Sequence, residues 1–142
     1  MAGFDGGLIT SNSGALLLGA TNKAIGLIER FAGAFSDGRD PDCIEHSLAT
    51  LVGQRVLGLA LGYQDINDHD QLRHDPVLAA VMGKLTARRK RCAPLAGKST
   101  LNRLEHAPEE GAFAAPARYH KISHDAAAIE RLPVDVFQQF SM

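Results

Sequence analysis

Residues 48–61 are apolar on almost every side when they are drawn as a helix. A helix of this kind has no polar face to turn toward water, so other elements have to bury it. Asp40 and Pro41 are residue types that begin helices, and Gly62 is the type that ends them. We therefore expect a central, buried helix over residues 41–61.

The rest of the chain is expected to supply helices around this one. Apolar residues recur at helical spacing from residue 13 to Phe35, where Ser11 or Ser13 can provide the N-cap. Shorter helices are predicted within 64–75, from Pro76, from an N-cap at Ser99 to Pro108, and as a pair over 125–132 and 133–140. The predicted fold is all-α: one small helical domain over residues 1–142, with a short extended arm over residues 1–10.

The composition favours an ordinary globular protein of the cytoplasm. The chain has 45% hydrophobic residues and a net charge of −1, which excludes a polycation that would coat nucleic acid along its whole surface. Cys43 and Cys92 are far apart, as expected for free thiols in a reducing compartment. Polar residues interrupt every long apolar run, so no membrane partner is expected.

Positive charge gathers in one part of the chain, residues 84–103, which we call the basic segment. It holds seven of the fifteen lysines and arginines, and no acid occurs between Pro76 and Leu104. Such clusters bind nucleic acid because phosphates release counterions when cations replace them. The alternative is a solvated loop whose charges cluster by chance. The candidate DNA-binding residues are Arg88, Arg89, Lys90, Arg91, Lys98, Ser99, Thr100, Asn102 and Arg103.

The run from Gly97 to Thr100 is similar to the end of a phosphate-binding loop. The complete motif needs a glycine where this chain has Cys92, and Pro94 interrupts the loop, so nucleotide hydrolysis is rejected. Two interpretations remain for Ser99 and Thr100: a single-phosphate anchor at a helix N-terminus, or an ordinary N-cap.

Acids and histidines alternate in residues 65–75. Asp65 with His69, and Asp70 with His74, are four residues apart and could share a metal ion on a helix. The two pairs point in different directions and neither has a third ligand, so caps and turns explain these residues equally well. We predict no metal ligand and no catalytic residue in this chain.

Several blocks, taken in order, resemble the N-terminal region of bacterial DDE transposases of the insertion-sequence thirteen-eighty family. The resemblance covers nearly the whole chain. Its blocks are residues 4–7 (FDGG), 13–18 (SGALLL), 40–41 (DP), 44–47 (IEHS), 54–55 (QR), 58–63 (GLALGY), 65–70 (DINDHD), 72–76 (LRHDP), 95–105 (LAGKSTLNRLE) and 118–122 (RYHKI).

The resemblance implies an RNase H-like catalytic core whose carboxylates hold Mg²⁺. In the family a segment like residues 132–137 leads to the strand with the first catalytic aspartate, and this sequence ends at Met142. We therefore expect a domain truncated before the core, with no cofactor of its own and no activity alone. The resemblance implies DNA handling: the domain binds duplex DNA, such as transposon ends, or contributes to assembly of the transposase complex, for which a homo-oligomer is one candidate form. The alternative is an interaction or oligomerisation module that packs on the missing core.

Overall fold

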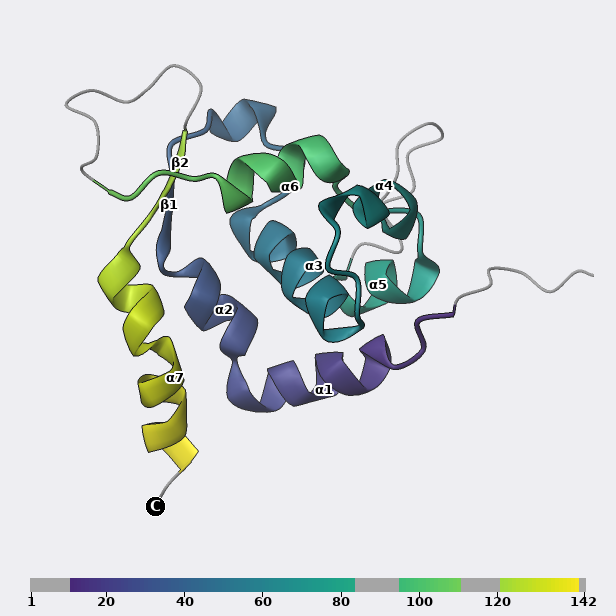
Figure 1. Cartoon of the computed structure of the whole chain (residues 1–142), viewed down its shortest axis with the longest axis horizontal. Helices are drawn as coiled ribbons and strands as arrows, with labels where there is room; N and C mark the ends of the chain where they lie inside the picture. The colour runs from purple at the N-terminus through teal and green to yellow at the C-terminus, as the bar shows by residue number, and fades with distance from the viewer. Residues whose placement is uncertain (1–10, 84–94, 111–120, 141–142) are drawn as a thin grey trace, which may run out of the picture.

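The computed structural model describes residues 11–83, 95–110 and 121–140, and in these ranges the chain is mainly helical. Helix α3 (Leu48–Ala60) lies at the centre, with the other helices around it (Figure 1). Leu51 and Val52 of α3 are completely buried. The prediction of a central buried helix is confirmed. The surrounding elements are α1 (Ala15–Ile25), α2 (Leu27–Ala32), α4 (His69–Leu72), α5 (Pro76–Val81) and α6 (Lys98–Glu105).

The predicted starts of two helices are wrong. Asp40 caps only a single 3₁₀ turn, η1 (Pro41–Cys43), by accepting from the N–H of Asp42 at 3.0 Å. The true N-cap of α3 is Ser47, whose hydroxyl accepts from the N–H of Thr50 at 3.2 Å. For α6 the N-cap is Gly97 and not Ser99, so Ser99 lies inside the helix.

The continuous helix expected from residue 13 to Phe35 is also wrong. It is broken at Gly26, which has a φ of +65°, a conformation that glycine adopts without steric cost. Gly14 is the N-cap of the first half, α1, in place of Ser11 or Ser13. Phe35 is not helical but opens strand β1 (Phe35–Asp37).

A small antiparallel sheet corrects the all-α prediction. Strand β1 pairs with β2 (Ile122–His124), so that Phe35 lies opposite His124. The fold is therefore mainly helical with one two-stranded sheet among the described residues. After β2 the chain forms α7 (Ala126–Phe140), one helix that continues through Pro133 where a pair of helices was expected. Helix α7 packs along α2 at the left of Figure 1.

Two predictions for the polar stretch before α5 are confirmed. Residues 64–75 form η2 (Ile66–Asp68) and α4, and Pro76 opens α5. Asp75 caps α5, because its Oδ1 accepts from the N–H groups of Val77 at 2.9 Å and Leu78 at 3.1 Å.

None of the described helices combines the length and the apolarity that crossing a membrane requires. The predicted N-terminal arm, residues 1–10, lies outside the described residues.

Candidate nucleic-acid interface

Helix α6 has one buried and one exposed face. Leu101 and Leu104 are buried against the core. The opposite face carries four of the predicted DNA-binding residues, all exposed: Lys98, Ser99, Asn102 and Arg103. Thr100, a fifth, is partly buried at the side of the helix. The structure thus brings the second part of the basic segment onto one polar surface, which we call the α6 face.

A buried amide fixes the position where α6 begins. The Gln54 side chain, on α3, donates from Nε2 to the carbonyl of Ala96 at 2.6 Å and accepts at Oε1 from the N–H of Ala96 at 3.0 Å. Both residues are buried. Because buried polar groups are costly to leave unpaired, this pair of hydrogen bonds holds the turn before α6 against α3.

His69 extends the same polar cluster under α6. Its imidazole is fully buried, with Nδ1 3.2 Å from Gln54 Nε2 and Nε2 3.4 Å from Arg55 Nη1. Both neighbours are N–H donors, and a neutral imidazole has one acceptor nitrogen, so only one of these contacts is a hydrogen bond. Burial, followed by the charge of Arg55, lowers the pKa of His69 from 6.5 to about 4. The ring is therefore neutral at physiological pH.

Arg55 connects three parts of the chain around this cluster. Its guanidinium pairs with Glu105 at the C-terminal end of α6. It also donates to the carbonyls of Tyr63 at 3.1 Å and Gln64 at 2.8 Å. Gln54 and Arg55 therefore connect the two ends of α6 to α3.

Asp70 meets the N-terminal end of α6. Its Oδ1 accepts from the N–H of Lys98 at 3.0 Å, and its Oδ2 lies 3.9 Å from Lys98 Nζ. A Cβ at Gly97 would lie 2.7 Å from Arg73 Nη1 and 3.0 Å from Asp70 Oδ1, so the ends of both side chains lie close to the backbone of Gly97. Because a carboxylate of the protein already occupies this helix end, the single-phosphate anchor at Ser99 and Thr100 loses its geometric basis.

The acids and histidines of residues 65–75 act mainly as caps. Asp65 accepts from the N–H of Asn67 at 2.9 Å, and Asp70 and Asp75 accept from backbone N–H groups at α6 and α5. Among the described residues, no group of three or more histidines, cysteines and acids is placed to hold a metal ion. The two proposed i,i+4 pairs therefore have structural partners in place of a shared ion.

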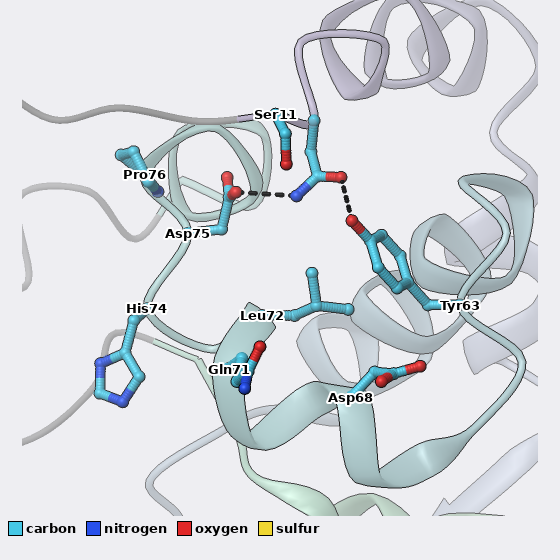
Figure 2. A pocket seen from close by; sticks show the side chains of 9 residues that line it. Ser11, Tyr63, Asp68, Gln71, Leu72, His74, Asp75 and Pro76 are labelled. Carbon is cyan, nitrogen blue, oxygen red and sulfur yellow. Dashed lines mark hydrogen bonds between the residues drawn. The ribbon is translucent and has the colours of Figure 1, made fainter.

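A polar pocket of about 290 Å³ lies beside α4 and α5 (Figure 2). Asn12 closes one side of it, donating from Nδ2 to Asp75 Oδ2 at 2.9 Å and accepting from the Tyr63 hydroxyl at 2.7 Å. The carboxylates of Asp68 and Asp75 line the pocket, and they repel phosphate. This pocket is consequently a poorer candidate for nucleic acid than the α6 face.

The first part of the basic segment, with Arg88, Arg89, Lys90 and Arg91, lies outside the described residues. Sequence reasoning missed the polar residues that lie around α6 and hold it in position: Gln54, Arg55, His69, Asp70 and Arg73. Gln54 and Arg55 carried a signal, since they are a polar pair inside the helix that the sequence predicts to be buried on almost every side. A buried polar pair in such a helix needs partners, although the sequence does not say which ones.

One family model matches the chain, and it covers residues 1–139: the transposase DDE domain group 1. No curated protein matches the chain, and no solved structure does.

Proposed function

Since the chain belongs to the transposase DDE domain group 1 family, we propose that it serves DNA transposition by binding duplex DNA through the α6 face. The observation that carries this proposal is the exposure of Lys98, Ser99, Asn102 and Arg103 on a single helix face. The DNA would be a transposon end of an insertion sequence of the thirteen-eighty type. The protein would act in the cytoplasm, where a bacterial chromosome lies.

The chemistry of the α6 face suits the DNA backbone. Lys98 and Arg103 supply positive charge, and Ser99 and Asn102 supply hydrogen-bond donors for phosphate oxygens. Arg88, Arg89, Lys90 and Arg91 continue the basic segment in sequence and would add phosphate contacts without reading bases. Thr100 would have at most a peripheral part, because it is partly buried.

We assign no catalytic residue to this chain, which would be inactive alone. The Mg²⁺ ions of the family's chemistry do not fit Asp65, Asp70 and Asp75, which already accept hydrogen bonds from backbone N–H groups. Among the described residues, no group of three or more histidines, cysteines and acids is placed to hold such an ion. Two-metal catalysis needs carboxylates that are free to converge on ions. The metals would be held by a catalytic core outside these residues.

The test compares two double variants in duplex-DNA binding at several salt concentrations. Lys98→Gln with Arg103→Gln removes two cations from the α6 face and should lower the slope of log affinity against log salt by roughly 2. Lys23→Gln with Arg30→Gln is the matched control, since these exposed cations lie on α1 and α2. In Figure 1, α1 lies below α3 and α2 to its left, while α6 lies above it. Equal affinities for the two double variants would disprove the role of the α6 face.

A separate variant tests the part of the basic segment that precedes α6. Changing Arg88, Arg89, Lys90 and Arg91 together to alanine should weaken binding to every duplex by a similar factor. A loss confined to one DNA sequence would instead show that these residues read bases.

A second candidate function is assembly, through packing on a catalytic core or on another subunit. It is favoured by the apolar side chains that the described surface exposes: Leu16, Leu17, Leu59, Val134 and Phe137. Leu59 also lines an apolar groove of about 450 Å³, together with residues that include Phe31, Val56 and Ile129. Light scattering of the wild type and of Val134→Ser with Phe137→Ser tests this function. A monomeric wild type at high concentration would count against homo-oligomers.

A further inference from the structure

Asp70 places a negative charge on the surface proposed to meet DNA. It belongs to α4, yet it contacts α6 at two points: the backbone N–H of Lys98 at 3.0 Å and Lys98 Nζ at 3.9 Å. The hydrogen bond to the backbone favours a position of the carboxylate next to Lys98.

A second cation lies at the same place. The position of a Cβ on Gly97 would be 2.7 Å from Arg73 Nη1 and 3.0 Å from Asp70 Oδ1, so both side chains reach the backbone of Gly97. The carboxylate therefore lies near two cations, Lys98 and Arg73, at the end of α6. Resting on the proposed function, we propose that Asp70 is a built-in electrostatic brake that weakens DNA binding by the α6 face.

The charge of Asp70 is separable from its role as a cap. Asn presents a carbonyl oxygen at the position of Asp70 Oδ1, so the hydrogen bond from the N–H of Lys98 does not require a carboxylate. A negative charge beside Lys98 offsets its attraction for phosphate and repels phosphates at neighbouring positions. Asp70 and Lys98 are each about half exposed, with side-chain exposures of 47% and 50%, so salt should screen this effect.

The experiment measures duplex-DNA affinity of the whole chain carrying Asp70→Asn. Affinity should rise about threefold at low salt, and the gain should shrink as salt increases. Asp68→Asn is the matched control, because Asp68 is exposed and lies two residues away, while the hydrogen bond and the ion pair that Lys98 makes are with Asp70. Equal gains in affinity for the two variants would show an effect of net charge alone and would overturn the proposed brake. Unchanged or weaker DNA binding by Asp70→Asn would overturn it as well.

A melting curve and a further variant keep the outcome interpretable. DNA affinities are compared at a temperature at which both the wild type and Asp70→Asn are folded. In a Lys98→Gln background the gain should be smaller, since part of the brake acts through Lys98. If Lys98→Gln with Arg103→Gln weakens binding while Asp70→Asn does not tighten it, the proposed function stands and the brake is wrong. If that double variant binds like the wild type, both are wrong.

Discussion

The side-chain amide of Gln54 makes a complementary pair of hydrogen bonds with the backbone of Ala96, a residue 42 positions away in the sequence. This pair joins the central helix α3 to the turn that begins α6. Since the proposed DNA contacts lie on α6, the stability of this buried joint determines whether the α6 face has a defined position.

Gln54→Leu should destabilise the protein strongly. The substitution keeps the size of the side chain but leaves the buried N–H and C=O of Ala96 without partners, at a cost of about 2–4 kcal/mol. Urea denaturation of the wild type and the variant measures the difference. Gln138→Leu is the control, because Gln138 is exposed on α7 and should change stability by less than about 0.5 kcal/mol. Similar losses in both variants would contradict this account of Gln54.

Stability should depend on pH through His69. Its pKa is lowered from 6.5 to about 4 by burial and by Arg55, so between these values the unfolded chain binds a proton that the folded chain does not. The stabilisation is complete above pH 6.5 and is lost as the pH falls toward 4, a loss on the order of 3 kcal/mol. Denaturation curves at a series of pH values measure it.

The control for this pH dependence is His74→Gln, since His74 is exposed. Between pH 6.5 and 4, His74→Gln should show the same slope of unfolding free energy against pH as the wild type. His69→Gln should flatten that slope. If His69→Gln kept the full slope, another group would be responsible.

Gly58→Ala should displace the imidazole of His69. A Cβ at this position would lie 2.8 Å from His69 Cε1 and 3.0 Å from Nε2, and both residues are buried, so neither can move freely. We expect a loss of about 1–3 kcal/mol in the free energy of unfolding. Gly14→Ala should be nearly neutral, because its Cβ would meet Leu61 at an ordinary 3.7 Å. Thermal melts of both variants test the contrast, which equal melting temperatures would refute.

Asp75→Ala should destabilise the start of α5. It removes the acceptor for the N–H groups of Val77 and Leu78, and also the partner of Asn12, for a loss of about 1–2 kcal/mol or somewhat more. Asp65→Ala provides a comparison, because Asp65 caps only the exposed turn η2. Asp75→Ala should show the larger loss in urea denaturation. The reverse order would contradict the idea that Asn12 adds to the cap.

The sequence by itself determined the elements that depend on neighbouring residues. The burial of α3 and the start of α5 at Pro76 follow from patterns within about one or two helical turns, because side chains three or four positions apart share a helix face. The charge of the basic segment was equally visible, and Lys98, Asn102 and Arg103 are exposed as a surface role requires.

Only the tertiary structure decided where longer-range partners override local preference. Phe35 leaves the predicted helix because it pairs with His124, far along the chain, and α7 continues through Pro133 where the sequence indicated a break. Likewise, Asp70 caps α6 from 28 residues away, a place that local reasoning gave to Ser99. A hydrogen bond between distant residues forms only once the chain has folded around α3, so no pattern of neighbouring residues could predict how α6 is held.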